Sequence, residues 1–406
     1  MRILHTADWH LGVHLGQHER TNEHALFLQW LLGVIDQQEI DVLVIAGDIF
    51  DTGNPSNTAL KQYYDFLWQV KNTCCRDVVI VGGNHDSVST LDAPRDLLRF
   101  FNVHVIGGVS DDFEKQVIEI KDQSGTVQLV ICAVPFLRDR DIRLSVPGES
   151  VDERQQRICQ GIVQYYLNLV PYILPYKERG IPIVATGHLF AAGAQVSSDS
   201  EKDIHVGNLG QVAGNLFPPE FDYIALGHLH RPQMVNRMPH IRYSGSPIPL
   251  SFSENNDRKV VLMADFVNGK LSDVEEISVP ISRRLVRIKG DWDKVKAKLS
   301  LIEPQPDELP VWVEVQVETD DYIPDLDEQL KALPFVNTEI VFVKQIRTRP
   351  YQNISENMEE PLSLNDINPL VVFEKKCEQD YVETGYDDLL QTFREAMELM
   401  ENGREN

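Results

Sequence analysis

The segment DVVIVGGNHD, residues 77–86, is an apolar run that ends in two glycines followed by an amide, an imidazole and a carboxylate. A short apolar run bounded by glycine is typical of a buried β-strand that leads into a tight turn. Taken alone, Asn84, His85 and Asp86 could be ordinary polar side chains of that turn. The segment becomes informative because the same pattern returns elsewhere in the chain.

Four further segments have this design, in which an apolar strand ends in acidic or histidine side chains. They are MRILHTADWH (1–10), DVLVIAGD (41–48), IPIVATGH (181–188) and FDYIALGHLH (221–230). Strands this apolar are typical of sheets buried on both faces, and in open α/β sheets ligands bind beyond the carboxyl ends of the strands. We therefore expect all five strand ends to place their polar residues along one edge of the fold.

Together the strand ends supply seven candidate metal ligands. These are Asp8, His10, Asp48, Asn84, His188, His228 and His230. Oxygen and imidazole donors without a thiolate are the mixture expected for Mn(II), Fe(II) or Zn(II) in a hydrolytic site. Seven ligands suit two ions about 3.5–4 Å apart, which stabilise the attacking and leaving oxygens of a displacement at phosphorus. Asp48 is the candidate for the bridging carboxylate.

The composition limits the class of protein. The chain of 406 residues is 42% hydrophobic and 25% charged, as in a soluble globular protein with one large core and a smaller domain. It contains no run of about 18 apolar residues and begins without a secretory signal pattern, so we expect a cytoplasmic protein without a membrane span. Its five cysteines show no CxxC spacing, which predicts reduced thiols.

The formal net charge of −24 is unfavourable for binding a polyanion such as DNA. The excess is uneven, because residues 351–406 hold 14 acidic and 4 basic residues. The dense basic cluster of the chain consists of Arg283, Arg284, Arg287, Lys289, Lys294, Lys296 and Lys298. A solvated face and a phosphate-binding surface are both consistent with this cluster. If the substrate is nucleic acid, another component must help to bind it.

The pattern of residues 1–280 mixes strands and helices. A helix is expected with Ala25, Leu28, Leu32 and Ile35 on its apolar face, and two more over 63–70 and 160–169. Hairpins are expected over residues 233–245 and 259–279, the second with an Asn-Gly turn at 268–269. This mixture predicts an α/β (α+β) fold of two sheets with helices outside.

The rest of the chain divides into three parts. Residues 281–345 predict a small α/β domain of three strands and two helices, and residues 346–360 predict a polar, acidic linker. Residues 361–406 predict two helices, one with an apolar stripe of Leu389, Phe393, Ala396, Met397 and Met400. These helices either pack on their own chain or dock on another protein, and the acidic linker before them favours docking.

The motifs DWH (8–10), GD (47–48), GNHD (83–86), GH (187–188) and GHLH (227–230) occur in the order of a known signature. In this respect the chain resembles the calcineurin-like metallophosphoesterases. Its segments ILHTADWHLG, AGDIFDTGNPS, DYIALGHLHRPQ and YSGSPIPLSF resemble those of bacterial nuclease subunits that work with an ATPase on DNA ends. The resemblance implies a two-sheet sandwich flanked by helices, a capping domain over residues 281–345 and C-terminal helices.

The resemblance also implies roles for individual residues. One metal would be held by Asp8, His10, Asp48 and His230, and the other by Asp48, Asn84, His188 and His228. His85 would protonate the leaving oxygen or steady the transition state, and Asp86 would orient its ring. Mn(II) is the ion expected at both positions.

The function implied is a Mn-dependent DNA phosphodiesterase that acts in DNA repair, recombination and replication. It would be an exonuclease on duplex ends and an endonuclease on hairpins or single strands. It would form a homodimer and bind its ATPase partner through residues 361–406. Two alternatives stay open: a phosphodiesterase or phosphatase of small molecules, which needs no C-terminal tail, and a non-catalytic scaffold, which the intact ligand set disfavours.

Overall fold

The computed structural model describes residues 1–144, 146–192, 212–213, 217–303, 309–320, 322–333, 337–348, 369–380 and 386–402. Its contacts divide the chain into two units. The first unit is Met1–Val317 with Pro324–Lys344, and the second is Glu318–Ile323 with Gln345–Asn406. Most of the predicted linker, residues 349–360, and the start of the predicted C-terminal segment, residues 361–368, lie outside the described residues.

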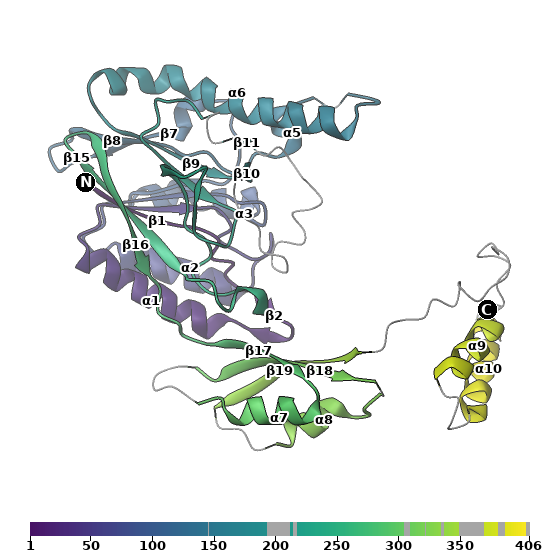
Figure 1. Cartoon of the computed structure of the whole chain (residues 1–406). Helices are drawn as coiled ribbons and strands as arrows, with labels where there is room; N and C mark the ends of the chain where they lie inside the picture. Colours follow the sequence, from purple (N-terminus) through teal and green to yellow (C-terminus); the bar gives the residue numbers. More distant parts are fainter. Residues whose placement is uncertain are drawn as a thin grey trace. The chain divides into compact units, whose positions relative to one another are not determined.

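Two six-stranded sheets form the centre of the first unit (Figure 1). The first has the order β16-β15-β1-β4-β5-β6, with β1 (Arg2–Thr6), β4 (Val42–Ala46), β5 (Asp77–Val81), β6 (Val103–Ile106), β15 (Val260–Val267) and β16 (Lys270–Ser278). The second has the order β13-β14-β12-β9-β8-β7, with β7 (Val117–Lys121), β8 (Val127–Cys132), β9 (Ile183–His188), β12 (Tyr223–Gly227), β13 (Gln233–Val235) and β14 (Met238–Tyr243). The predicted hairpins are the antiparallel pairs β13–β14 and β15–β16.

Alternate side chains of each central strand enter two different cores, which explains why the strands are apolar throughout. In β4, Val42 and Val44 point between the two sheets, where they pack with Ile131 and Val184 of the second sheet. Leu43 and Ile45 of the same strand point outward, into the core that the first sheet shares with its helices. The predicted two-sheet fold with helices outside is confirmed.

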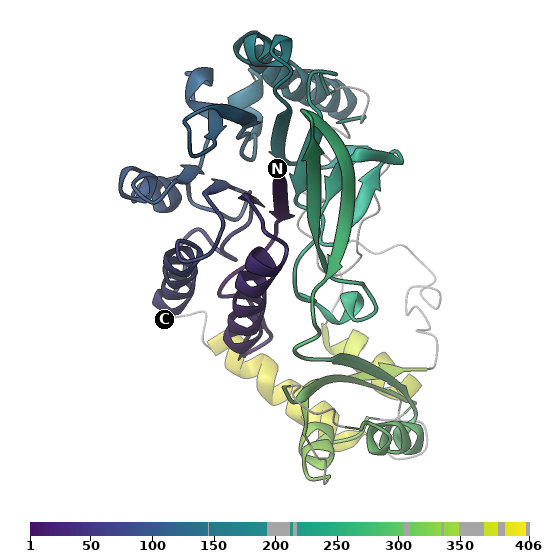
Figure 2. The same ribbon diagram turned by 90° about the vertical axis from the view of Figure 1, so that its left-hand side faces the viewer.

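Helices cover both outer faces of the sandwich (Figure 2). Helices α1 (Thr21–Gln37) and α2 (Asn57–Val70) pack on the first sheet, and α6 (Val151–Glu178) packs on the second. Short elements connect these layers: β2 (His14–Leu15), β3 (His18–Glu19), α3 (Val88–Asp92), α4 (Arg95–Arg99), η1 (Phe113–Gln116), α5 (Asp139–Ile142), β10 (Ala191–Ala192), β11 (Val212–Ala213) and η4 (Phe252–Glu254).

The apolar face predicted for the first helix is wrong in part. Leu28 and Ile35 are buried, but Ala25 is exposed, and the buried face of α1 also contains Phe27 and Leu31. Apolar residues occur on more than one side of this helix, so periodicity alone did not select the side that contacts the sheet.

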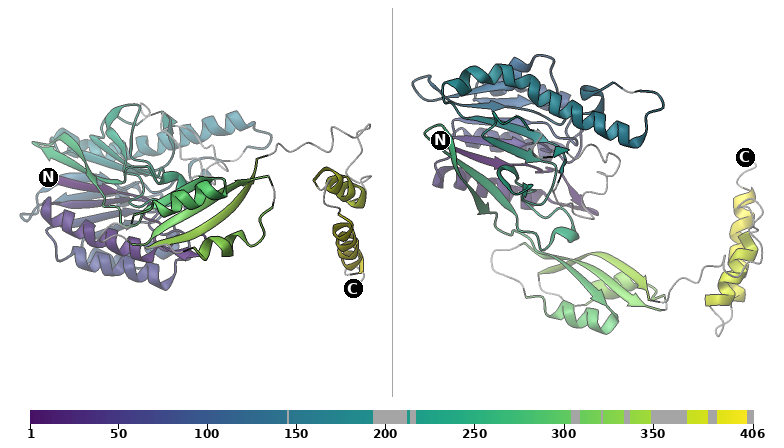
Figure 3. Two further views of the ribbon diagram at one scale, coloured as in Figure 1. Left: turned by 60° about the horizontal axis from the view of Figure 1, so that its bottom comes forward. Right: turned by 45° about the horizontal axis from the view of Figure 1, so that its top comes forward.

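A three-stranded sheet of order β17-β18-β19 follows, with two helices on one of its faces (Figure 3). Its elements are β17 (Leu285–Gly290), α7 (Trp292–Ser300), β18 (Val311–Thr319), α8 (Leu326–Lys331) and β19 (Thr338–Arg347). They occupy the positions that the sequence predicts for the strands and helices of the small α/β domain. The Asp291 side chain caps α7 by accepting a hydrogen bond of 2.9 Å from the amide of Lys294.

A buried ion cluster joins this small sheet to helix α1. One carboxylate oxygen of Glu23 accepts hydrogen bonds of 2.7 Å from both Arg20 and Arg283. The two guanidinium groups lie 5.4 Å and 4.0 Å from the ring centre of Trp312 in β18. Arg283 is therefore buried and paired inside the fold, where it has a structural role.

Three of the six remaining members of the basic cluster are also paired with acids. Arg287 binds the buried carboxylate of Glu314, and Lys294 and Lys296 bind Asp291 and Asp293. These paired side chains are therefore less available to bind phosphate than the sequence suggests.

We expect Glu23→Gln to destabilise the protein by about 3–5 kcal/mol, because two buried guanidinium groups would lose their shared carboxylate. Denaturant unfolding measures this loss. Glu39→Gln is the matched control, since the Glu39 side chain is 85% exposed and pairs with Arg2 at 3.6 Å; its effect should stay below about 1 kcal/mol. Equal, small effects of the two substitutions would contradict a stabilising role for the cluster.

The second unit contains helices α9 (Pro369–Asp380) and α10 (Asp387–Asn402). The rings of Phe373 and Phe393 stack at 4.1 Å between the two helices. Leu390 is buried, and Phe393 and Met397 of the predicted stripe are half-buried, whereas Leu389 and Ala396 of that stripe are exposed. The predicted face of this helix is therefore right in part. No helix in the described part of the chain is long and apolar enough to cross a membrane.

Candidate metal centre

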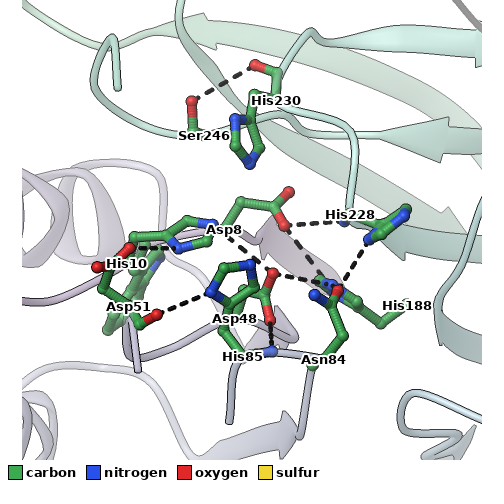
Figure 4. A network of polar contacts seen from close by, with 12 residues as sticks. Asp8, His10, Asp48, Asp51, Asn84, His85, His188, His228, His230 and Ser246 are labelled. Carbon is green, nitrogen blue, oxygen red and sulfur yellow. Dashed lines mark hydrogen bonds and ion pairs between the residues drawn. The ribbon is translucent and has the colours of Figure 1, made fainter. Parts of the chain in front are cut away.

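The five predicted strand ends meet at one edge of the sandwich (Figure 4). β1, β4 and β5 approach this edge from the first sheet, and β9 and β12 approach it from the second. All seven candidate ligands lie there, together with His85. The ligand atoms of Asp8, His10 and His230 lie within 4.8 Å of one another, and so do those of Asp8, Asp48 and His188.

Asp48 lies between two groups of potential ligands. Its Oδ2 atom is 3.6 Å from Nε2 of His10 on one side and 3.1 Å from Nε2 of His188 on the other. On the His188 side, Oδ1 of Asn84 is 3.0 Å from Nε2 of His188 and 2.9 Å from Nδ1 of His228. A carboxylate in this position is suited to bridge two cations.

The backbone at this edge is strained. Asp8, His10, Asp48 and His228 have φ angles of 53°, 48°, 49° and 100°, in a region that residues other than glycine rarely adopt. Such conformations persist only where the surrounding structure enforces them, and they cluster at functional sites. Four of the seven candidate ligands are therefore held in conformations that the local sequence alone would not favour.

The glycines at the strand ends permit the close approach of these segments. A Cβ atom on Gly83 would overlap the carboxylate of Asp48, and one on Gly227 would overlap the carbonyl oxygen of Ala46. Glycine is therefore needed at these two positions, because backbone from one strand passes directly against the end of another.

The site couples acids and histidines electrostatically. Burial disfavours the charged forms of Asp48 and His188, yet their mutual attraction lowers the pKa of Asp48 and raises the pKa of His188 to about 9. Burial and the charge of His188 lower the pKa of His228 to about 3. Two carboxylates and a set of histidines thus lie close together. Bound cations would replace the protons that balance the charge of the carboxylates.

The donor set fits divalent cations. Asp8 Oδ2 and His10 Nε2 are buried, and neither has a hydrogen-bond partner among the residues that the structure describes. Asp8 uses its other oxygen to accept a 2.8 Å hydrogen bond from the amide of His228. Two unsatisfied polar atoms facing a cluster of oxygen and nitrogen donors are what a cation site requires.

We expect metal binding at pH 7 to release close to one proton from His188. Below its pKa of about 9 this imidazole is protonated, and a histidine binds metal only in its neutral form. Metal affinity should therefore fall as the pH decreases below 9, by up to about tenfold per unit for this group. Calorimetry in two buffers of different ionisation enthalpy measures the protons released, and a release of zero would contradict this assignment.

His85 lies beside the predicted ligands. Its Nδ1 atom is 2.7 Å from the carbonyl oxygen of Asp51, and its amide donates a 2.9 Å hydrogen bond to Oδ1 of Asp48. The ring centres of His85 and His10 are 4.8 Å apart. Because Nδ1 donates its proton to a carbonyl, Nε2 is the nitrogen that can exchange a proton with a bound substrate.

The prediction that Asp86 orients the ring of His85 is wrong. The carboxylate of Asp86 accepts hydrogen bonds from the amides of Gly83, Ile49 and Phe50, at 2.8, 3.1 and 3.0 Å. Asp86 therefore ties the end of β5 to the segment after β4, and a backbone carbonyl orients His85 instead. A sequence motif does not show which backbone groups its side chains contact.

Two further carboxylates contact candidate ligands, and neither belongs to a motif in the sequence. Oδ1 of Asp51 is 3.3 Å from Nδ1 of His10, and Oε1 of Glu254 is 3.3 Å from Nδ1 of His230. Asp51 follows the GD motif by three residues, which is a weak signal. Glu254 lies 24 residues after its histidine, and no pattern in the sequence connects them.

Comparison with known proteins agrees with this geometry. The family model of calcineurin-like phosphoesterases matches residues 1–232, and that of the type 5 capsule protein repressor C-terminal domain matches residues 282–381. The SbcD component of the SbcCD nuclease from Escherichia coli K12 is 40% identical over 367 residues, which cover 89% of this chain and 90% of that protein. The chain belongs to the SbcD family of calcineurin-like phosphoesterases.

Other members of the SbcD family are similar over most of their length. The SbcD component of the SbcCD nuclease from Bacillus subtilis is 31% identical over 355 residues, covering 86% of this chain and 88% of that protein. A solved structure, TT1561 of Thermus thermophilus, is 12% identical with a TM-score of 0.36, over 69% of this chain and 99% of that one. The predicted resemblance to metallophosphoesterases is confirmed, and this SbcD-family chain is a metal-dependent phosphoesterase.

Proposed function

We propose that this SbcD-family chain is a Mn(II)-dependent DNA phosphodiesterase that cuts duplex ends, hairpins and single strands. The observation that carries the proposal is the placement of Asp48 between two groups of oxygen and imidazole donors, with His85 beside them. Its relatives are nucleases by name, which supports a nucleic-acid substrate. In this proposal the protein acts in the cytoplasm, in DNA repair, recombination and replication.

In this proposal the residues of the site hold two metal ions and donate a proton. Asp8, His10, Asp48 and His230 would hold one ion, and Asp48, Asn84, His188 and His228 would hold the other. Two divalent ions supply charge neutralisation at the phosphate and an activated water for in-line displacement. His85, fixed through Nδ1 by the carbonyl of Asp51, would donate the proton from Nε2 to the leaving oxygen.

The remaining parts of the chain would serve substrate access and partner binding. Residues 281–345 would cap the nuclease domain of residues 1–280. Residues 346–360 would link this cap to residues 361–406, which would dock on an SbcC-type ATPase. The relatives are named as subunits of the SbcCD nuclease, and the acidic composition of the tail supports docking on a basic partner surface. The partner would then supply much of the surface that attracts DNA.

A homodimer is part of the same proposal, and an exposed apolar groove supports it. The groove of about 400 Å³ lies between α2 and α4 and is lined by Tyr64, Leu67, Trp68, Pro94, Leu97, Leu98, Phe101 and Val103. Trp68 is 60% exposed and Leu97 is 63% exposed, and together they form an apolar patch of the kind that marks interaction sites. A second copy of this chain would bury them.

We expect Leu97→Glu to convert a dimer into monomers, because it places a charge within the apolar interface. Light scattering after size-exclusion chromatography measures the mass of both proteins. Leu144→Glu is the matched control, since Leu144 is 87% exposed and lies outside the groove. A wild-type monomer, or a dimer that survives in the Leu97 variant, would contradict this arrangement.

Cleavage of an end-labelled DNA hairpin by the purified chain in Mn(II) tests the nuclease proposal. The same reaction is run with bis(p-nitrophenyl) phosphate and with a chain truncated after residue 360. We expect the full chain to cut the hairpin. We expect the truncated chain to lose binding to the ATPase in a pull-down but to keep turnover of the small ester. If the ester alone is hydrolysed, with and without the ATPase, the chain is a phosphodiesterase of small molecules.

A further inference from the structure

A buried cluster of charged and polar side chains lies behind His230. Oε1 of Glu254 is 3.3 Å from Nδ1 of His230, while Oε2 of Glu254 is 2.5 Å from Nζ of Lys259. The same Oε2 atom accepts hydrogen bonds from the amide of Leu250 at 3.2 Å and the hydroxyl of Ser246 at 3.3 Å. Each oxygen of the Glu254 carboxylate therefore has a defined partner.

The cluster is deeply buried. Glu254 has no exposed surface, and the side chain of Lys259 is 4% exposed. Burying a carboxylate and an ammonium costs free energy that their attraction only partly returns, and an apolar pair of similar size is often equally stable. The ion pair is therefore poorly explained by stability alone, and its contact with a candidate ligand needs another reason.

The orientation of the His230 ring supplies that reason. A carboxylate at Nδ1 accepts the proton of that nitrogen and turns Nε2 toward Asp8 and His10 (Figure 4). Lys259 also donates a 3.1 Å hydrogen bond to the carbonyl oxygen of His230, so backbone and ring of this residue are fixed from the same cluster. Ligand histidines in metalloproteins usually have a partner of this kind, which fixes the ring and strengthens the ligand.

We propose that Glu254 is a positioning residue that fixes the ring of His230 for metal binding, and that Lys259 balances its charge. The inference rests on the metal-binding role proposed for His230 and adds the residue that makes this ligand effective. The short helix η4 places Glu254 at the site, and the Leu250 amide holds the carboxylate in place. Asp51 contacts Nδ1 of His10 at 3.3 Å, but its side chain is 29% exposed, so Glu254 is the more constrained of the two carboxylates.

The test measures Mn(II) binding in the full chain, not activity. Isothermal titration calorimetry gives the number and affinity of sites, and electron paramagnetic resonance distinguishes coupled from isolated Mn(II) ions. The variants are Glu254→Gln and the double variant Glu254→Gln/Lys259→Met, which leaves no unpaired buried charge and so preserves a folded protein. Glu314→Gln is the matched control, because Glu314 is also a buried carboxylate paired with basic residues but lies in β18.

We expect both Glu254 variants to bind one of the two ions about 10–100-fold more weakly, with loss of the coupled spectrum, while the Glu314 variant keeps both ions. Two ions bound with wild-type affinity in both Glu254 variants would overturn the positioning role, whatever their stability. A wild-type chain that binds fewer than two ions would instead overturn the proposed two-metal centre, and this inference with it.

Discussion

Replacing His85 with glutamine should lower the rate of phosphodiester cleavage by about 10²–10⁴-fold and leave the bound metal unchanged. Glutamine keeps a polar side chain of similar reach but cannot release a proton from Nε2 to a leaving oxygen. The seven side chains assigned to the two ions do not include His85, whose ring is oriented by the Asp51 carbonyl, so both ions should stay bound. Turnover of bis(p-nitrophenyl) phosphate and metal analysis of the same preparation measure the two quantities.

His104→Gln is the control for this experiment. His104 is a partly buried histidine whose Nε2 atom is 3.0 Å from Asp77, at the start of β5 and away from the strand ends. Its substitution should change neither rate nor metal content. A His85 variant as active as this control would remove His85 from the proposed chemistry, and a His85 variant that loses metal would make it a ligand instead.

Asp48→Asn should weaken both metal positions at once, by at least about 100-fold in affinity, because one carboxylate serves the two groups of ligands. Asparagine tolerates the left-handed backbone that Asp48 adopts, with φ of 49°, so the local conformation should survive. What changes is the charge that faces His10 and His188. Calorimetric titration with Mn(II) separates loss at both sites from loss at one.

A surface aspartate provides the comparison. Asp65→Asn removes a carboxylate that is 56% exposed and paired with Lys61, and it should leave the titration unchanged. Two intact sites in the Asp48 variant would refute the bridging assignment, and loss of a single site would place Asp48 within one group of ligands.

The sequence predicts the centre of this protein well because each ligand follows a strand that is apolar on both faces. Such strands have few alternative positions, and their carboxyl ends share one edge, so Asp8, Asp48 and His188 meet as expected. The hairpin at Asn268-Gly269 is equally local, since two consecutive residues with positive φ favour that turn.

Other features depend on contacts between segments that are distant in the sequence. These contacts cannot be predicted from the sequence. The buried side of α1 is decided by the sheet it meets, which leaves Ala25 exposed. Arg283 belongs to a basic cluster in the sequence, yet it pairs with Glu23, 260 residues earlier in the chain. Asp86 binds the amides of Ile49 and Phe50, and Glu254 contacts His230. Only the folded chain brings these partners near, so these contacts could not be assigned from motifs.

The proposed chemistry depends on a two-metal site bridged by Asp48. Anomalous diffraction from crystals grown with Mn(II) can reveal this site, because it locates each ion without reference to activity. We expect two anomalous peaks about 3.5–4 Å apart, with Asp48 contacting both, His10 and His230 on one side and His188 and His228 on the other. A single peak, or two peaks that do not share Asp48, would contradict it.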